Sequence, residues 1–486
     1  MNAIMAVMLA AMLVSSISCI VLRSRPCAAT VMPFCSFVLL VLALALCIPI
    51  AGGEVLDDGV FYMDALSAIF MLLVAFVGLM ASIYSRAYIG LEAQEGVIGR
   101  RETGQYYSLM IVFISVMMLT FAVRSMAVVW LGIGATTLVS TFLVGFYSKE
   151  ESTEAAWKYI ILCSVGITIA LAGFTLVYAS TVGRIDSGAS LDWPALMEAA
   201  SELDPTMMKM ATAMIIVGFG TKVGFVPMHT WLPDAHSQAP SPVSGLLSAV
   251  LLNCALYGII RFYAVSEIVN PGFAPAVMLT FGLLSLAAAA FFIVSSRDLK
   301  RMLAYSSIEN MGLIAIGFGI GSPLAIAGAL LQMIAHSVTK PILFFSAGDA
   351  VQSYGTRDMR SIRGLGKTMP FTAFMLTVGT LAIIGAPPFA VFVGEFTLIG
   401  AAVSEGSYWI AGAMVVLLSI VFAGFVKNVF PMMVGDPGRE VDQHACVSRR
   451  LPMVVLFLVS LLMGLFMTDG MRECLSNAAA CLGAFL

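Results

Sequence analysis

The chain has 486 residues, of which 60% are hydrophobic and 11% are charged, and its formal net charge at pH 7 is -3. Soluble domains carry about 25% charged residues, so this composition, with a mean hydropathy of +0.99, excludes a soluble fold. No basic run and no basic–aromatic patch stands out, and we therefore expect no nucleic-acid partner.

Apolar stretches of about 20 residues, the length that crosses a bilayer, predict an all-α membrane protein with about fourteen transmembrane helices. The predicted helices span residues 1–22, 31–51, 60–84, 105–123, 126–147, 157–180, 209–229, 239–263, 273–296, 301–320, 322–350, 371–402, 407–430 and 451–468. No soluble domain fits between them, because the longest hydrophilic segment is 181–208. The tail 468–486 could form one short surface helix.

The charges at the ends of these helices predict the orientation in the membrane. In a signal peptide the positive charge precedes the apolar core, whereas Arg23 and Arg25 follow the first apolar stretch, which predicts an uncleaved helix with its N-terminus outside. The odd-numbered loops hold basic residues and the even-numbered loops hold mostly acids. The positive-inside rule therefore places the odd loops in the cytoplasm and both termini outside a cell inner membrane. The basic residues of the odd loops are Arg86, Arg100, Arg101, Lys149, Arg297, Lys300, Arg301, Arg357, Arg360, Arg363, Lys367, Arg439, Arg449 and Arg450.

The nine cysteines form no CxxC pair and no Cys/His cluster with metal-ligand spacing, and no GxGxxG follows a strand. We therefore expect no metal, iron–sulfur cluster, flavin, haem or nucleotide in this chain, and any redox chemistry belongs to another subunit. Most cysteines lie in apolar helices, where they are expected to be small core residues. Cys474 and Cys481 lie outside in the predicted topology and could form a disulfide or remain free.

The remaining chemistry lies in a few ionisable side chains at predicted membrane depth. Lys222 lies within the apolar stretch 210–232, and the glycine and proline that follow it indicate a broken helix. A charge at the bilayer centre costs about 2.5–3.5 kcal/mol on insertion scales, so such a residue faces a wet cavity or a partner. His229 and His236 flank a Trp-Leu-Pro turn near the predicted cytoplasmic end and could serve either loop structure or proton uptake.

The second half of the chain repeats this arrangement. His336 and Lys340 lie four residues apart and so share one helix face. Glu395 lies in a second apolar segment that glycine and prolines interrupt, and Glu309 begins the helix after a basic loop, where we expect it nearer the cytoplasmic surface than the midplane. Two interrupted helices, one in each half, predict an inverted-repeat transporter. Lysine, histidine and glutamate at the midplane suit a proton relay, because hydration and partners change their charge.

Each of these residues also has a structural interpretation. Lys222 could be held in a structural pair, and His336 could be a hydrogen-bonded core histidine. Lys158 and Arg261 lie near predicted helix ends and could extend their charged groups to the interface.

Four sequence blocks, in order, resemble the proton-translocating antiporter-like subunits of respiratory complex I, cation/proton antiporter complexes and membrane-bound hydrogenases. They are GFGTKVGFVPMHTWLPDAHSQAPSPVSGLLSAVLLNCALYGIIRF, DLKRMLAYSSIENMG, HSVTKPILFFSAGD and APPFAVFVGEF. The resemblance covers about residues 60–430. Within the family the chain is most similar to hydrogenase-4 component F, on EAAWKYIILCSVG, the asparagine of LLNCALYG, and QMIAHS.

The resemblance implies fourteen helices with two inverted five-helix repeats, each containing a discontinuous helix. It divides the chain into N-terminal helices (1–104), a first repeat (105–263), a second repeat (273–430) and a C-terminal helix with a tail (431–486). Lys222 then matches the central lysine of the first discontinuous helix. Lys340 and His336 match the residues that link the half-channels, and Glu395 matches the terminal acid.

Two positions depart from the family pattern. The family usually has a buried glutamate on the fifth helix that pairs with the central lysine, and here Gly134 occupies that position within VVWLGIGATTLVSTFLVGFY. No acid lies between Gln105 and Tyr147. Asn253 stands where many members have a lysine on the eighth helix, and asparagine can bind a water but cannot carry the charge.

Three functions follow as hypotheses. The first is a membrane-arm subunit of a hydrogenase or complex-I-like oxidoreductase, with other membrane subunits and nickel–iron hydrogenase or complex-I-like hydrophilic subunits as partners. The second is a subunit of a cation/proton antiporter complex. The third is a non-conducting scaffold of the same fold, which the glycine at position 134 keeps open.

Overall fold

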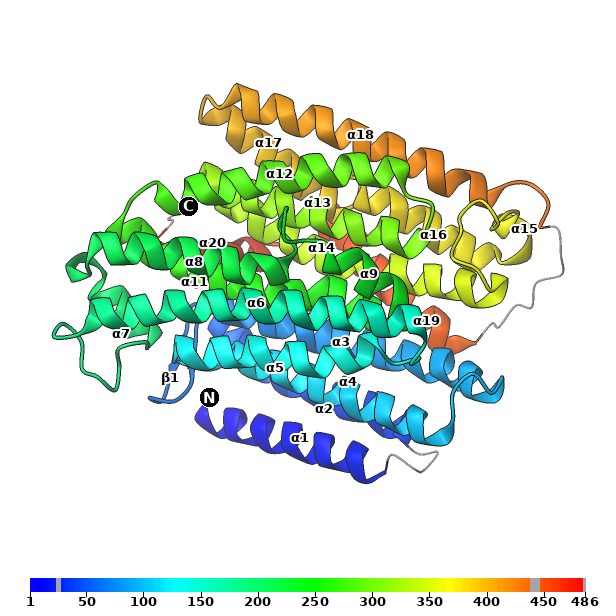
Figure 1. Cartoon of the computed structure of the whole chain (residues 1–486), viewed down its shortest axis with the longest axis horizontal. Coiled ribbons are helices and arrows are strands. Elements are labelled where there is room, and N and C mark those ends of the chain that lie inside the picture. The colour runs from blue at the N-terminus through cyan, green and yellow to red at the C-terminus, as the bar shows by residue number, and fades with distance from the viewer. Residues whose placement is uncertain (23–27, 438–445, 484–486) are drawn as a thin grey trace.

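Long apolar helices lie side by side along one axis in the structure, a computed structural model that describes residues 1–22, 28–437 and 446–483 (Figure 1). Arg23, Arg25 and Arg439, which contributed to the predicted orientation, lie outside the described residues. Within the described ranges, twelve helical spans are long and apolar enough to cross a membrane. The chain is therefore a multi-pass membrane protein, as its composition predicts.

In chain order the elements are α1 (Asn2–Val21), α2 (Ala28–Ala51), β1 (Leu56–Asp57), β2 (Tyr62–Met63), α3 (Ala65–Gln94), α4 (Arg100–Thr120), α5 (Met126–Val144), α6 (Glu150–Thr181), α7 (Trp193–Glu198), η1 (Ala200–Glu202), α8 (Pro205–Val223), α9 (Trp231–Gln238), α10 (Ser241–Leu246), the π-helical turn η2 (Leu247–Leu251), α11 (Leu252–Val269), α12 (Phe273–Ser295), α13 (Leu299–Ile320), α14 (Pro323–Tyr354), α15 (Leu365–Thr368), α16 (Pro370–Ile383), α17 (Ala390–Ser404), α18 (Tyr408–Met433), α19 (Val447–Leu465) and α20 (Asp469–Ala480).

Two interrupted helices complete the set of membrane crossings. They are α8 with α9, broken at residues 224–230, and α16 with α17, broken at residues 384–389. With the twelve long spans, they give the described chain the fourteen predicted crossings. Five crossings run from α4 to α11 and five from α12 to α18. Because five is odd, the second series begins at the opposite end of the bundle from the first, so the two repeats are inverted.

Local chemistry fixes the element ends that hydropathy alone does not. The third helix begins at Ala65 and not at residue 60, because β1 and β2 pair antiparallel before it and the carboxylate of Asp64 accepts a hydrogen bond from Ser67 N at 3.0 Å. That bond satisfies one of the free N–H groups of the first turn. The predicted boundary after residue 320 is confirmed: α13 ends at Gly321, whose φ of 74° favours glycine.

Glycines bring the helices of each repeat into close contact. A Cβ on Gly282 of α12 would lie 2.8 Å from the carbonyl oxygen of Gly312 in α13, and one on Gly166 of α6 would lie 2.6 Å from that of Gly218 in α8. No larger residue fits at such separations. The pairs α12–α13 and α6–α8 therefore form tightly packed walls beside the broken helices.

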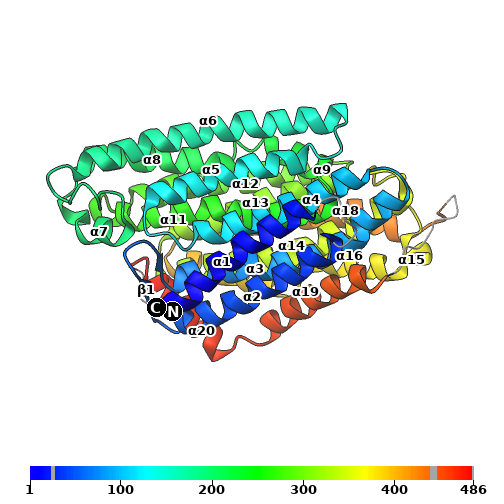
Figure 2. The same ribbon diagram turned by 90° about the horizontal axis from the view of Figure 1, so that it is seen from below.

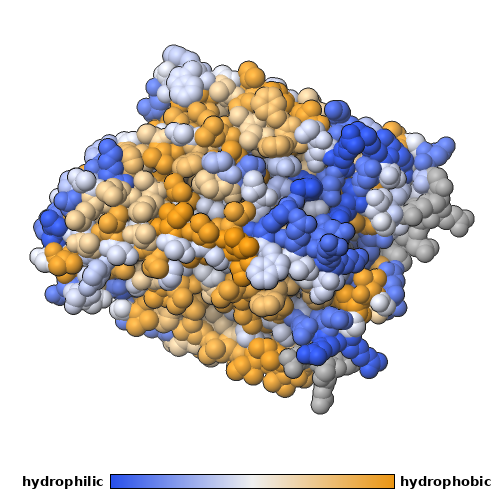
Figure 3. All heavy atoms as spheres, in the orientation of Figure 1, coloured by the Kyte–Doolittle hydropathy of each residue, from blue (hydrophilic) through white to orange (hydrophobic). Residues whose placement is uncertain are grey.

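The two ends of the bundle differ in chemistry. The start of α1 and the helix α20 lie at one end (Figure 2), as an even number of crossings requires. Hydrophilic side chains gather at the other end, where α9 and α15 lie, and apolar side chains cover most of the face between (Figures 1 and 3). We call the end at α9 and α15 the basic end, because the described basic residues of the odd-numbered loops lie there.

The structure favours one of the two alternatives for Cys474 and Cys481, and the expectation for Arg261 is wrong. Cys474 and Cys481 are both free; they are seven residues apart in and at the end of α20, about 10 Å along the helix, too far for a disulfide. Arg261 does not extend to the interface: it is 1% exposed, and its guanidinium donates to Asp64 Oδ2 at 2.6 Å and Oδ1 at 2.7 Å. The charge of Arg261 is neutralised inside the bundle.

Candidate functional site

The first break lies between α8 and α9 and is covered by protein. Gly224 ends α8 with a φ of 90°, a conformation that glycine adopts without strain. The indole N–H of Trp231, at the start of α9, donates to the carbonyl oxygen of Thr221 at 2.7 Å. A carbonyl that the break would leave without a partner is thereby satisfied, as is required at membrane depth.

Lys222, in the last turn of α8, is fully buried and is held by oxygens of α5. Its ammonium donates to Ile133 O and Thr136 Oγ1, each at 2.6 Å, and to Thr137 Oγ1. These are three neutral acceptors for the three donors of an ammonium. Among the described residues, no carboxylate interacts electrostatically with Lys222, whose ionisable neighbours are Cys163 and Cys254.

Gly134 lies on the same turn of α5 as these oxygens, but the space beside it is open. An added Cβ would meet no atom within 4 Å. The position that the family pattern assigns to a glutamate is therefore neither filled nor blocked by a neighbouring side chain of this chain.

The second break lies between α16 and α17 and supports Glu395. This residue is 7% exposed on α17, and its Oε1 has no hydrogen-bond partner. An added Cβ on Gly385, whose φ is 69°, would lie 2.0 Å from Glu395 Oε2. The carboxylate thus rests against the backbone of the break, in space that only a glycine at position 385 leaves free.

From Glu395 a polar chain crosses to α14 and α13. The residue before it, Gly394, packs so closely on Gln332 of α14 that a Cβ would lie 2.2 Å from Gln332 Oε1. Gln332 Nε2 donates to Asn310 Oδ1 at 2.8 Å, and Asn310 Nδ2 donates to Glu309 Oε2 at 2.6 Å. The charges of Glu309 and Glu395 are near enough to interact.

The predicted position of Glu309 is wrong. Glu309 is 1% exposed and lies ten residues after the start of α13, about 15 Å along the helix. Half of a hydrocarbon core of about 30 Å is the same distance, so the carboxylate lies near the midplane. The basic residues before Glu309 had suggested a surface position, but they lie in the first turn of α13, more than two turns before Glu309.

Lys340 and His336 lie on α14 beside Glu309. The ammonium of Lys340 donates to Leu303 O at 2.8 Å and to Ser306 Oγ, and its charge interacts with that of Glu309. His336, one turn earlier, is fully buried, and neither ring nitrogen has a hydrogen-bond partner. The alternative of a hydrogen-bonded core histidine therefore receives no support at His336.

Asn253 joins α11 to this chain. Its Nδ2 donates to Ser337 Oγ at 2.8 Å and to Ala249 O at 2.9 Å, and its Oδ1 has no partner. Ser337 is the residue next to His336. The structure thus brings Glu395, Glu309, Lys340, His336 and Asn253 into one buried series. Lys222 lies beyond it, and among the described residues no hydrogen bond joins it to Asn253.

The two histidines of the first break occupy different settings. His229 lies within the break, partly buried, with its ring 6.0 Å from that of Phe292. His236 lies in α9, fully buried, with both ring nitrogens unpartnered and its ring 5.5 Å from that of Phe344 in α14. His236 therefore lies beside the helix of His336 and Lys340, and His229 does not share that environment.

Several buried charges were not predicted from the sequence, among them Lys300 and Glu92. Lys300 was read as a loop residue but is 3% exposed, and Glu92 is 6% exposed in the last turn of α3. The predicted third helix ended at residue 84, ten residues before its end at Gln94, so Glu92 fell outside it. The small and apolar residues around Glu92 in AYIGLEAQ are the signal that could have extended that helix.

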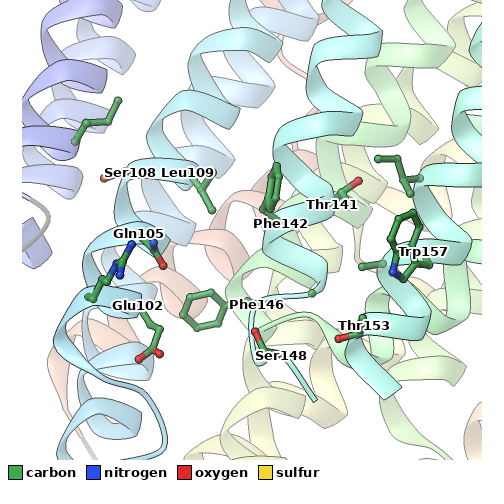
Figure 4. Close-up of a pocket in the computed structure, with 15 residues that line it drawn as sticks. Glu102, Gln105, Ser108, Leu109, Thr141, Phe142, Phe146, Ser148, Thr153 and Trp157 are labelled. Carbon is green, nitrogen blue, oxygen red and sulfur yellow. The ribbon is translucent and has the colours of Figure 1, made fainter. Parts of the chain in front are cut away.

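A cavity of about 870 Å³ lies apart from this series, among α1, α4, α5 and α6 (Figure 4). Figure 4 shows Glu102, Gln105 and Thr153 near its loop side and Phe142 and Trp157 along its walls. None of the ionisable residues of the buried series lines it.

Comparison with known proteins identifies the family and the fold of this chain. Residues 123–421 match the family described as NADH:quinone oxidoreductase/Mrp antiporter, TM, and residues 58–95 match NADH-Ubiquinone oxidoreductase (complex I), chain 5 N-terminus. The chain belongs to this family of antiporter-like membrane subunits. A relative from Methylacidiphilum infernorum, called hydrogenase-4 component F homolog, is 36% identical over 416 residues, or 85% of this chain and 87% of the relative.

Two solved structures have the same fold. A chain of the membrane-bound sulfane sulfur reductase, an archaeal respiratory membrane complex, superposes with a TM-score of 0.88 at 22% identity, over 99% of this chain and 97% of that chain. A chain of the Mrp complex from Dietzia sp. gives a TM-score of 0.84 at 21% identity, over 98% and 97%. The resemblance stated from the sequence, including that to hydrogenase-4 component F, is confirmed.

Proposed function

We propose that this chain is a membrane-arm subunit of a membrane-bound hydrogenase or related complex-I-like oxidoreductase and that it contributes to proton translocation. The observation that carries the proposal is the buried series from Glu395 through Glu309, Lys340 and His336 to Asn253. Its polar atoms without partners, such as Glu395 Oε1, Glu309 Oε1 and both His336 nitrogens, lie along one route. Buried polar groups of this kind are normally satisfied by ordered water.

In this mechanism the redox partner supplies a conformational or electrostatic change that acts first near Glu395. A proton that binds Glu395 removes its repulsion toward Glu309, so Glu309 can then hold its charge beside Lys340. A change in the charge of Lys340 then alters the proton affinity of His336, one turn away. Water near Asn253 carries protons between this pair and Lys222. Each group takes up a proton from the cytoplasmic side, transfers it laterally, and releases it outward.

The proposal includes an orientation and partners. The basic end faces the cytoplasm and both termini face outward from the cell inner membrane. Nickel–iron hydrogenase or complex-I-like hydrophilic subunits carry the redox centres, since this chain is expected to hold none. Other membrane subunits pack on its lipid-length helices. His229 is assigned to the structure of the break, and His236 to proton uptake, because only His236 lies against α14.

Lys340→Ala tests the relay in the intact complex. Proton uptake into inverted native membrane vesicles, driven by the complex's own redox reaction and followed with a fluorescent pH probe, is expected to fall. Lys427→Ala is the matched control, because Lys427 is an exposed lysine of α18 outside the buried series. Native gels establish that both variants assemble. Unchanged proton transport in an assembled Lys340→Ala complex would show that this relay is wrong.

A specific observation supports the non-conducting alternative: Lys222 is bound to neutral oxygens and Gly134 supplies no counter-charge. Gly134→Glu tests it, since an added Cβ at this half-exposed position meets no neighbouring atom. A gain in protons moved per redox turnover is expected if the missing acid limits this subunit. No gain would show that pairing at Lys222 is not the limiting feature.

Mass spectrometry of the proteins that co-purify from native membranes in mild detergent separates the redox complex from an antiporter complex. Nickel–iron hydrogenase or complex-I-like hydrophilic subunits are expected with the tagged chain. Recovery of small membrane subunits alone would favour a cation/proton antiporter.

A further inference from the structure

Glu92 is a buried acid that the proposed relay does not use. It lies in the last turn of α3 at the basic end, and it is 6% exposed although Ala93, Gln94 and Glu95 after it are exposed. The hydroxyl of Tyr147, just beyond α5, donates to Glu92 Oε1 at 2.7 Å, and Oε2 has no partner. Burying a carboxylate with an oxygen unsatisfied is costly, and Tyr88, Lys300 and Arg449 near Glu92 offset part of that cost.

Lys300 connects Glu92 to the helix of Glu309. Its ammonium is 3% exposed and donates to the carbonyl oxygen of Ala239, and its charge interacts with that of Glu92. Lys300 is in the first turn of α13, three residues before Leu303, whose carbonyl oxygen accepts from Lys340 at 2.8 Å. The backbone of Lys300 is therefore about one helical turn from the carbonyl that binds Lys340, while the Lys300 ammonium itself is bound by Ala239.

His236 completes the connection. It precedes Ala239, the acceptor of Lys300, by three residues, and Ser244 Oγ donates to both His236 O at 2.8 Å and Ala239 O at 3.2 Å. Its ring nitrogens are unpartnered, and the ring interacts electrostatically with Lys300, Lys340 and His336. Glu92, Lys300 and His236 are therefore buried ionisable groups between the basic end and the pair on α14, and no direct hydrogen bond joins Glu92 to Lys300 or the His236 ring to a neighbour among the described residues.

We propose that Glu92 is the loading point at which this chain takes up protons at the basic end and that His236 passes them to His336 and Lys340. Lys300 is a positioning residue, whose charge holds the carboxylate toward the interior. A proton from bulk water binds the Glu92 carboxylate, moves through water to a free nitrogen of His236, and leaves Glu92 ionised for the next proton. This inference rests on the proposed function.

Glu92→Gln tests the loading point, because glutamine keeps the size and the hydrogen bond to Tyr147 but cannot carry a proton onward. In inverted vesicles containing the intact complex, the rate of redox-driven proton uptake is expected to fall on the order of 10²-fold, the scale for loss of a proton-transfer group. Glu95→Gln, an exposed acid at the end of the same helix, is expected to behave like the wild type. Glu92→Asp, which keeps the acid but shortens the side chain, is expected to transport protons faster than Glu92→Gln. If the size of the side chain were what mattered, Glu92→Gln would be the better variant.

The outcomes separate this inference from the proposed function. If Lys340→Ala abolishes uptake and Glu92→Gln does not, the loading point is wrong and the relay stands. If neither variant loses uptake, both are wrong. Should Glu92→Gln fail to assemble, Tyr147→Phe, which removes the donor to Glu92 together with the Tyr147 contact to Tyr88, is expected to slow uptake in an assembled complex. Wild-type rates in Tyr147→Phe would then overturn the proposal.

Discussion

Gly385→Ala perturbs the site at the second break without changing any charge. The φ of 69° at Gly385 is in the left-handed region, which costs an L-residue about 1–2 kcal/mol. The new methyl group would also lie 2.0 Å from Glu395 Oε2 and 2.7 Å from Glu395 Cδ, so the carboxylate must leave its present position. We therefore expect both a lower stability and a loss of proton transport.

Gly400→Ala is the matched control on α17. Its added Cβ meets nothing within 4 Å and φ there is helical, so the change is expected to stabilise the helix by about 0.5–1 kcal/mol. The two glycine-to-alanine changes should therefore differ by about 1.5–3 kcal/mol in free energy of unfolding, with opposite signs. The unfolding midpoint of the purified protein in detergent and redox-driven proton uptake in vesicles measure the two effects. A Gly385→Ala variant with wild-type stability and transport would refute the reasoning.

Two further predictions concern groups that the fold buries. Asp64→Asn leaves the charge of Arg261 without a charged partner, which is expected to lower the free energy of unfolding by about 3–5 kcal/mol. The double variant Asp64→Leu with Arg261→Met should recover most of that loss in the same unfolding assay. A further loss in the double variant would contradict the pairing argument. Trp231→Phe removes the donor to the carbonyl oxygen of Thr221 and is expected to lower the free energy of unfolding by about 1–3 kcal/mol, whereas no change would mean that this carbonyl has another partner.

Periodicity and hydropathy predicted the crossings because each needs about 20 apolar residues. They did not predict where helices begin, since Asp64 as a cap and the pairing of β1 with β2 act through hydrogen bonds that hydropathy does not measure. For Glu309, the nearby basic residues indicated a surface position, although a helix rises about 1.5 Å per residue and ten residues separate Glu309 from the start of α13.

The sequence predicted which residues belong to the candidate site, but it did not predict which groups they contact. Lys222, Lys340 and Glu395 stood out because charges are rare in apolar segments, but their partners are oxygens and glycines from distant helices, such as Ile133 and Gly385. Glu92 was not predicted as a site residue because it lies at a helix end, where an acidic residue is normally expected to be exposed to solvent. Its burial follows from how α3 packs, which no single-sequence pattern encodes.

The open space beside Gly134 has a genetic counterpart. Some glycine codons become glutamate codons through a single base change, and no neighbouring side chain of this chain would have to move to admit the first atom of the new residue. Where Gly134 has such a codon, the glycine and glutamate forms are separated by a single mutational step whose first added atom meets no neighbour. A population carrying this gene could therefore sample both forms of the subunit, and selection on energy yield in different growth conditions would decide between them.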